Sequence, residues 1–476
     1  MVAKYQALES GANNVIAFPV RDVNSDLTRA LNRMSARFSL YSHYSQYYDG
    51  KQPLTFQSDK YRSNFARMVS KYVENMCPIV VDAASDRLTV HGIEVEGGDT
   101  DAAGAALWNV WDREVMALRA QEIHTEAIKT GDAYLIVWPN PQGEAKFFVN
   151  RAERMTCFYA EDSDTIEMAA KWQFGDDGYS HVTLYYPDRF EYYISTNIVR
   201  IGAPDARTTY KQEMPSQRNP WGLVPVFHFA NDALDMFGTS DLHDVCPIQD
   251  GLNKSVADML VGMEFSAYNQ RWAAGLEITE DPITGRKKPP FEPGQDRLWV
   301  SEDKDVKFGE FTATSLDNFI NAHDMFVTSV ARVSGTPIQY MLLDTSTFPS
   351  GEALKTAEAR FVKRVVRKQH SFGAVWQRVM NFVAAIERIS IPETTRVKIH
   401  WEDANPRSDY DSAQTAVLKK QVGVSDEQNM REMGYSEEEI AQMTKEKDDA
   451  AEADVKRQQA VFAAKGGAPN DDPKKA

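Results

Sequence analysis

The stretch 352–388 contains no proline and repeats its apolar residues at helical spacing. A period of about 3.6 residues predicts one unbroken amphipathic helix with a single apolar face. A helix of this length must bury that face along several other elements, so it constrains the fold more than any other segment. Its apolar positions are Leu354, Ala357, Phe361, Val365, Phe372, Val375 or Trp376, Val379, Val383 and Ile386.

Two more long helices are predicted on either side of a compact segment. A helical run covers 241–275, and about 1.5 Å per residue makes it a rod of about 50 Å. Residues 276–311 then combine proline, glycine and alternating charge, which favours a β-like insertion. A helix over 316–333 leads back, and Ser334-Gly-Thr-Pro337 ends it. The first rod has an apolar stripe of Leu252, Val256, Leu260, Met263, Ala267 and Trp272.

The first 130 residues are predicted to be mainly helical. Asp26 caps a helix over 27–34, and a run of tyrosines after it ends at the turn signal Asp49-Gly50. Gly131 lies where a C-terminal cap belongs. Further helices are predicted at 65–76, where Pro78 stops the helix, and at 102–129, and short strands at 79–81 and 87–93.

From residue 133 the apolar period changes to two, which indicates strands separated by hairpin turns such as Asp176-Asp177-Gly178. They predict one antiparallel meander of roughly 70 residues, closed by the proline-containing strand 219–229. The fold class is therefore α+β and predominantly helical. The strands are expected at 133–138, 145–149, 169–174, 181–186 and 189–194.

After a strand over 397–401, the C-terminal part shows short helices with clear boundaries. One covers 410–421 and ends at Gly423. The next begins at Ser425, where Gln428 completes a capping box, and another begins at Ser436. From Gly466 the chain is small, polar and expected to be disordered.

The charge balance of the chain limits how it can treat nucleic acid. Its 53 Lys and Arg against 69 Asp and Glu leave a net charge of −16. Tight binding over the whole surface needs cations that displace phosphate counterions, so a protein that grips DNA everywhere is excluded. An acidic protein can still let DNA slide past it. The sequence by itself leaves an ordinary acidic protein equally open.

Targeting signals and metal or disulfide frameworks are not expected. No apolar run approaches the roughly 18 residues of a membrane span, and residues 1–10 lack the pattern of a secretory signal. Cys77, Cys157 and Cys246 stand far apart, which is typical of buried thiols in a reducing compartment.

A search for catalytic motifs favours a protein that is not an enzyme. The chain contains no GxxxxGK[ST], GxGxxG, HExxH or GxSxG. Ser301 and Lys304 match SxxK, but charged neighbours and missing partners favour a surface turn. His243 and Cys246 share a helix face, yet two ligands do not make a metal site. We therefore expect no catalytic residue, no cofactor and no metal.

The order of these features resembles the portal proteins of tailed double-stranded DNA bacteriophages, of the siphophage type. The resemblance covers about 27–465 and implies the portal fold, with wing, stem, clip and crown regions. It rests on phrases such as Tyr47-Tyr48-Asp49-Gly50, the Asn-Pro-Trp-Gly-Leu-Val-Pro-Val run at 219–226, the segment 241–250, Ser334-Gly-Thr-Pro337 and Ser350-Gly-Glu-Ala353. The implied regions are 1–240 wing, 241–275 stem helix, 276–314 clip, 315–335 returning stem helix, 336–351 channel loop, 352–402 long wing helix and strand, 403–465 crown helices and 466–476 disordered tail.

The resemblance also implies partners and a place of action. About twelve copies form a ring at one capsid vertex, and double-stranded DNA passes through its channel. The clip is implied to dock the terminase motor and the head-tail adaptor, and the ring to contact the major capsid and scaffolding proteins. This places the protein in the virion after assembly in the host cytoplasm, without a membrane.

Three groups of residues are candidate sites. The channel loop has no Lys or Arg, which suits contact with a moving duplex; the alternative is a solvent loop packed by its own apolar residues. Arg286, Lys287 and Lys288 are a docking surface of the clip or a solvated turn. The channel loop comprises Gln339, Tyr340, Met341, Leu342, Leu343, Asp344, Thr345, Ser346, Thr347 and Phe348.

The third group is a basic cluster on the long helix 352–388. It is either a belt near DNA or a salt-bridged surface facing acidic residues of the next subunit, and the acidic chain favours the second. The cluster comprises Lys355, Arg360, Lys363, Arg364, Arg367 and Lys368.

Two other classes of function stay open. One is a different head-completion or minor capsid protein, acting as a monomer or a smaller ring. The other is a nucleic-acid-processing enzyme without a recognisable motif. The oligomeric state separates the first class from a portal, and nuclease and metal assays address the second.

Overall fold

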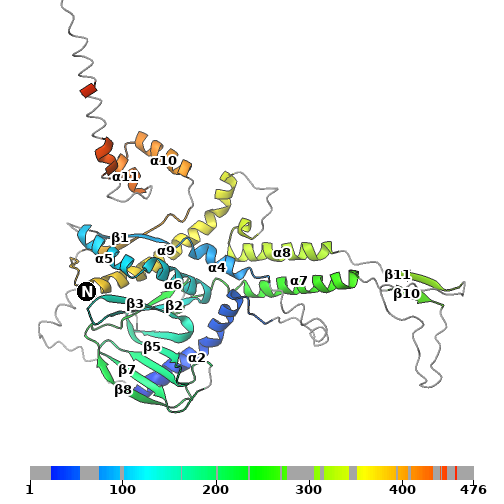
Figure 1. Cartoon of the computed structure of the whole chain (residues 1–476), viewed down its shortest axis with the longest axis horizontal. Coiled ribbons are helices and arrows are strands. Elements are labelled where there is room, and N and C mark those ends of the chain that lie inside the picture. Colours follow the sequence, from blue (N-terminus) through cyan, green and yellow to red (C-terminus); the bar gives the residue numbers. More distant parts are fainter. Residues whose placement is uncertain are drawn as a thin grey trace, which may run out of the picture. The chain divides into compact units, whose positions relative to one another are not determined.

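The computed structural model describes residues 23–53, 74–96, 101–161, 163–199, 202–233, 236–267, 271–275, 305–310, 316–341, 351–392, 395–405, 409–432, 440, 442–447 and 456–457. It divides into two compact units, 1–404 and 405–476 (Figure 1). Helices and strands both contribute heavily to the first unit, so "predominantly helical" holds only loosely for the fold class.

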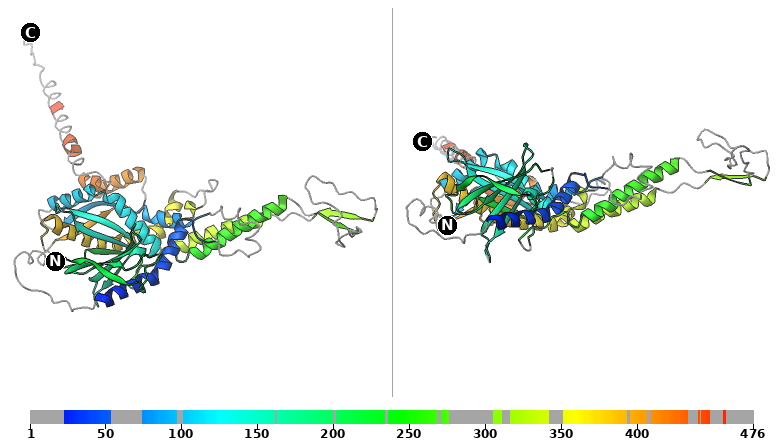
Figure 2. Two further views of the ribbon diagram at one scale, coloured as in Figure 1. Left: turned by 60° about the horizontal axis from the view of Figure 1, so that its bottom comes forward. Right: turned by 90° about the horizontal axis from the view of Figure 1, so that it is seen from below.

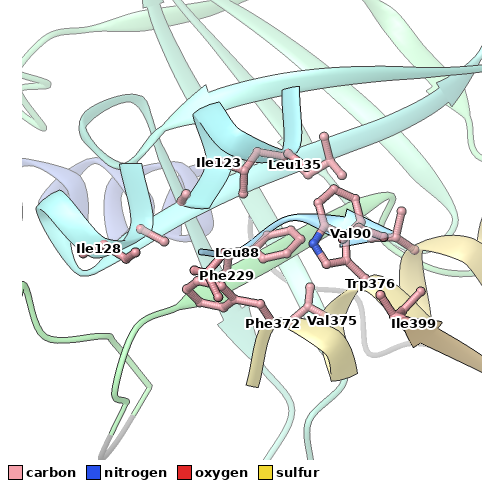
Figure 3. Close-up of a cluster of buried hydrophobic side chains, with 14 of the residues drawn as sticks. Leu88, Val90, Ile123, Ile128, Leu135, Phe229, Phe372, Val375, Trp376 and Ile399 are labelled. Atoms are coloured by element: carbon pink, nitrogen blue, oxygen red, sulfur yellow. The ribbon is translucent and has the colours of Figure 1, made fainter. Parts of the chain in front are cut away.

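The predicted long helix is confirmed as α9, Gly351–Glu387, and its apolar face is part of the main core. Phe372 and Trp376 are fully buried there, and the Trp111 ring meets Trp376 edge-on at 5.0 Å. Figure 3 shows this core gathering side chains from segments far apart in the chain, including Leu88, Phe229 and Trp376. Burial of such large side chains stabilises each by about 1.5–3 kcal/mol, so α9 organises the first unit.

The strands after residue 130 form two sheets, so the prediction of one meander is wrong. β2 pairs antiparallel with β3 and, through a long connection, with β9. The strands β4 to β8 form a separate five-stranded antiparallel sheet. A short 3-10 turn at Ala152–Arg154 redirects the chain between the sheets, a break that alternation alone does not reveal. The bounds are β2 Asp132–Pro139, β3 Ala145–Arg151, β4 Met155–Tyr159, β5 Ile166–Phe174, β6 Ser180–Tyr185, β7 Arg189–Ser195, β8 Tyr210–Arg218 and β9 Val226–Ala230.

The N-terminal helices confirm part of the prediction and correct the rest. α2 covers Val23–Tyr48, and Gly50 in the turn after it has a φ of 68°, a conformation that favours glycine. The strand expected at 79–81 is instead within helix α4, Cys77–Ser85, because Pro78 at its first turn favours the start of a helix. The helix expected at 65–76 falls mostly outside the described residues.

The helix expected over 102–129 is divided in two. α5 covers Asp101–Arg113 and α6 covers Met116–Thr130, and Val115 between them has a φ of 52°. Gly131 caps α6 as predicted, and its φ of 101° suits glycine. A side chain is also excluded at this position, because a Cβ on Gly131 would lie 2.7 Å from the carbonyl oxygen of Gly238.

Two long antiparallel helices, α7 Cys246–Ala267 and α8 Asp317–Ser334, pack side by side in both views of Figure 2. The α8 prediction is confirmed, whereas α7 is shorter than the predicted rod. Arg271–Ala274 forms strand β10, which pairs with β11, Lys307–Glu310. Trp272 is therefore in a strand, where its ring packs over Gly309, and does not continue the helical stripe.

The remaining described elements agree with the predicted pattern, except that the strand expected at 87–93 lies three residues later. β1, Val90–Glu96, pairs antiparallel with β12, Arg396–Trp401, across more than 300 residues of chain. In the second unit, α10 covers Asp409–Gln421 and Gly423 follows it with a φ of 99°. α11 covers Asp426–Glu432, and the Gln428 backbone N–H donates to Ser425 Oγ at 3.2 Å, as the predicted cap requires.

Candidate functional site

The start of α7 is held against the body by polar side chains. The Tyr47 hydroxyl of α2 donates to Asp250 Oδ1 at 2.8 Å, and the Tyr44 hydroxyl lies 2.9 Å from His243 Nδ1. The side-chain oxygen of Gln249 accepts the Met76 N–H at 2.9 Å. The tyrosine run that the sequence singled out therefore joins α2 to the base of the two long helices.

Close packing fixes α8 against α7. A Cβ on Gly251 would lie 2.6 Å from the Phe326 ring, so only glycine admits this approach of the two helices. At a second level, the Phe319 ring lies over Gly262. His323 of α8 reaches the Glu74 carboxylate at 3.0 Å, which ties α8 to the body as well. The pair α7–α8 is therefore anchored at its body end by both packing and charge.

Beside this base, α9 buries an ammonium group. The Lys368 side chain is 1% exposed, and its Nζ lies 3.1 Å from Asp241 Oδ1 and 3.4 Å from Asp232 Oδ2. Lys368 also donates to Asn231 Oδ1, and Arg364 binds Asp241 at 2.7 Å. Burial by itself would raise the pKa of Asp241, but the two cations hold this pKa below its usual value.

The remaining cations of the basic cluster border an open hollow of about 460 Å³. Arg360 and Lys363 are exposed, and neither forms an ion pair with any residue that the structure describes. Arg367 reaches Asp232 at 3.3 Å but stays 67% exposed. The cluster is thus divided between buried and solvent-facing positions; the side chain of Lys355 lies outside the described residues. Lys368 forms no part of an exposed face.

The first residues of the predicted channel loop are tied to α9. Gln339 Nε2 donates to Glu358 Oε1 at 2.9 Å, and the Tyr340 hydroxyl donates to the same oxygen at 3.2 Å. Arg87 pairs with Glu358 at 3.0 Å and also donates to the Tyr340 hydroxyl. Gln339 and Tyr340, the first residues of the predicted loop, are therefore held against α9. Residues 342–350 lie outside the described residues, as do the clip residues Arg286, Lys287 and Lys288.

Comparison with known proteins identifies the family. The family of phage portal proteins described as SPP1 Gp6-like matches residues 28–453. The chain belongs to this family. Two portal proteins are similar to it along most of their length: that of Mycobacterium phage D29 is 28% identical over 75% of each chain, and that of Mycobacterium phage L5 is 27% identical, covering 77% of this chain and 76% of the phage L5 protein.

Solved neck structures of gene transfer agent particles are also similar to this portal family member. A chain from the neck of an empty particle, with C6 symmetry, has a TM-score of 0.45 and 11% identity and covers 81% of this chain and 96% of its own length. A chain from the neck of a native particle, with C12 symmetry, has a TM-score of 0.44 and 11% identity, covering 79% and 92%. Family membership rests on the sequence match.

A thiol, an imidazole and a carboxylate lie in a row in the interior of this portal chain, and no sequence motif predicts them. We call this group the buried line. Cys157 Sγ lies 3.6 Å from His228 Nδ1, and His228 Nε2 lies 2.8 Å from Asp132 Oδ1. This order resembles a nucleophile, base and orienting acid. All three residues are fully buried, so no substrate reaches them. Sequence patterns could not predict this group of three residues, because Asp132 and His228 are 96 residues apart in the chain.

The buried line connects three parts of the fold. Asp132 is on β2, His228 on β9 and Cys157 on β4 of the other sheet, and Tyr41 of α2 donates to Asp132 Oδ2 at 2.6 Å. Burial alone would lower the pKa of His228, but Cys157 and Asp132 beside it raise this pKa to about 10. The imidazolium and the carboxylate therefore form an ion pair that joins the sheets to α2.

Metal-ligand clusters and membrane spans are not found in the described part of the chain. No group of three or more His, Cys, Asp or Glu residues there could hold a metal ion. None of the described helices is long and apolar enough to cross a membrane.

Proposed function

We propose that this chain is the ring subunit of a tailed-phage portal vertex, with about twelve copies around a central channel. Double-stranded DNA enters the capsid through the channel during packaging and leaves through it during ejection. The protein acts in the virion after assembly in the host cytoplasm, and its role is structural, not catalytic.

One observation supports this proposal beyond family membership. The antiparallel helices α7 and α8 extend from the body, and contacts of Tyr47, Gln249 and Gly251 fix their base. A stem with a fixed base is what a ring subunit with a projecting clip requires. In this proposal the regions are 1–240 and 352–402 wing, 241–275 and 315–335 stem, 276–314 clip, 336–351 channel loop, 403–465 crown and 466–476 tail.

The proposal also assigns a partner to each of these regions. The clip, with Arg286, Lys287 and Lys288, docks the terminase and the head-tail adaptor, and the outer surface meets the major capsid and scaffolding proteins. The acidic chain suits a conduit that DNA passes without being trapped.

Negative-stain images of the purified chain test the proposal. We expect rings with a central hole and a mass of about 640 kDa for twelve copies of 53.7 kDa. A monomer or a smaller ring would favour another head-completion or minor capsid protein instead. Nuclease activity of the purified chain would contradict the structural role.

The channel loop can be tested separately from ring formation. Deletion of residues 343–347 is expected to leave rings intact, because the loop begins from the fixed point at Gln339 and Tyr340. DNA packaging or retention should then fall. The measurement is the DNA content of particles assembled with the deleted portal; normal DNA content would refute a channel role for this loop.

A further inference from the structure

Two of the cations that border the hollow beside α9 form no ion pair within the described residues. We call this hollow the basic hollow, defined by Arg360, Lys363 and Arg367. Arg360 and Lys363 make no ion pair within the described part of the chain, whereas Arg364 and Lys368 on the same helix are both paired. Unpaired cations around a concave surface are suited to bind an anionic group.

A second surface presents two carboxylates that form no ion pair with any cation that the structure describes. The acidic groove, with a volume of about 400 Å³, is lined by Asp82 and Asp86 at the end of α4, together with Pro78, Ile79 and Tyr340. Asp82 accepts the Tyr48 hydroxyl at 2.8 Å and Asp86 accepts the Gln121 amide at 3.2 Å, so both partners are neutral. No cation among the described residues forms an ion pair with either carboxylate.

Arg87 also lines the acidic groove but does not neutralise it. Its guanidinium already pairs with Glu358 at 3.0 Å, and both side chains are 14% exposed. The groove therefore keeps the charge of Asp82 and Asp86.

The two surfaces lie across α9 from each other. Glu358 holds Arg87 and Tyr340, which form one wall of the acidic groove. Arg360 is two residues further along α9 and borders the basic hollow. Residues two apart on a helix lie about 200° apart around its axis, so the Glu358 and Arg360 side chains leave α9 toward opposite sides.

We infer that Arg360 and Lys363, at the rim of the basic hollow of one copy, pair with Asp82 and Asp86, at the rim of the acidic groove of the next copy around the ring. This inference rests on the proposed function. A heterologous contact joins two different surfaces of identical chains, and surfaces on opposite sides of a subunit are what a closed ring of such contacts needs.

The spacing of the charges matches. Asp82 and Asp86 are four residues apart and Arg360 and Lys363 are three apart, so each pair lies on one face of its helix with Cβ atoms about 5–6 Å apart. Two carboxylates can then face two cations at once. Asp232 and Asp241 also line the hollow, but Arg367 pairs with Asp232 and Arg364 pairs with Asp241, which leaves Arg360 and Lys363 to face an anionic partner.

A charge exchange tests the contact. The variants R360E/K363E and D82K/D86K each place like charges against each other, so each should lose rings. The interface dissociation constant should rise by about tenfold or more. Combining all four substitutions restores opposite charges, and rings should return. The control K211E/R218E makes the same change in net charge on the exposed strand β8 and should assemble normally.

The outcomes separate this inference from the portal assignment. Rings that persist in both charge variants overturn the contact but leave the portal assignment standing. Intact R360E/K363E rings with weaker, salt-dependent DNA binding would assign the hollow to DNA. If the unsubstituted chain forms no ring, the proposed function itself fails.

Cross-linking tests the contact without requiring a complete ring. Chains carrying K363C are mixed with chains carrying D86C and treated with a short bis-maleimide. Cys77, Cys157 and Cys246 are buried, so the reagent acts on the introduced thiols. We expect an adduct of two chains, and none when K211C replaces K363C. Absence of the K363C–D86C adduct contradicts the inference.

Discussion

Two halves of the basic cluster on α9 have opposite surroundings. Lys368 is 1% exposed and surrounded by Asp241, Asp232 and Asn231, whereas Arg360 and Lys363 face solvent over the basic hollow. The sequence presents all of these cations as one patch. Their difference teaches that a run of charge on a helix can serve two purposes, since Arg364 and Lys368 on one face stabilise the fold, whereas Arg360 and Lys363 on the neighbouring face remain exposed to solvent.

The largest effect is expected at the buried end of the cluster. Substituting Lys368→Met leaves Asp241 and Asp232 with less compensation in a buried site. Breaking a buried pair in this way costs about 3–5 kcal/mol. Urea unfolding of the chain measures the loss, with Lys363→Met as the matched control at about 0.5 kcal/mol or less. An equal loss of unfolding free energy for Lys368→Met and Lys363→Met would show that burial does not distinguish the two halves of the cluster.

A second buried ion pair extends the comparison to pH. The pKa of His228 is raised to about 10, so its charged form stabilises the fold fully below the ordinary histidine pKa of about 6.5. This contribution is lost as the pH rises from about 6.5 through about 10. His228→Asn should cost about 2–3 kcal/mol at pH 6.5 and flatten this pH dependence.

Thermal unfolding between pH 6 and pH 10 measures the dependence. The exposed His91→Asn on β1 serves as the control and should leave the profile unchanged. A His228→Asn profile parallel to that of the unsubstituted chain would show that His228 is neutral in the fold.

The smallest effect is expected where an ion pair is half-buried. Glu358→Gln weakens the contacts with Arg87, Gln339 and Tyr340, whose partly exposed pair contributes about 1 kcal/mol. The exposed Glu122→Gln on α6 should change the free energy of unfolding by less than about 0.5 kcal/mol. A loss at Glu358 as large as that at Lys368 would show that burial does not set the order.

Much of the helical architecture could be predicted because it depends on local pattern. The periodicity of 352–388 and 316–333 places α9 and α8 within a residue or two, and Gly50, Gly131 and Gly423 mark helix ends. Where local signals compete, prediction fails. Ile79 to Val81 are β-branched and apolar, but Pro78 in front of them begins α4.

The candidate site could be predicted only in outline. The sequence identifies the basic cluster and predicts a channel loop that begins near Gln339, but it does not show that Glu358 binds Gln339 and Tyr340. The acidic groove was not predicted, because Asp82 and Tyr340 are far apart in the chain and come together only in the folded protein.

The sequence by itself determined the family, the order of the helices and the charge balance, because these depend on local composition and on the order of segments. Only the tertiary structure decided that the strands form two sheets, that Lys368 is buried and that Cys157, His228 and Asp132 align. Each of these depends on contacts between residues tens to hundreds of positions apart, and local periodicity carries no information about such pairings.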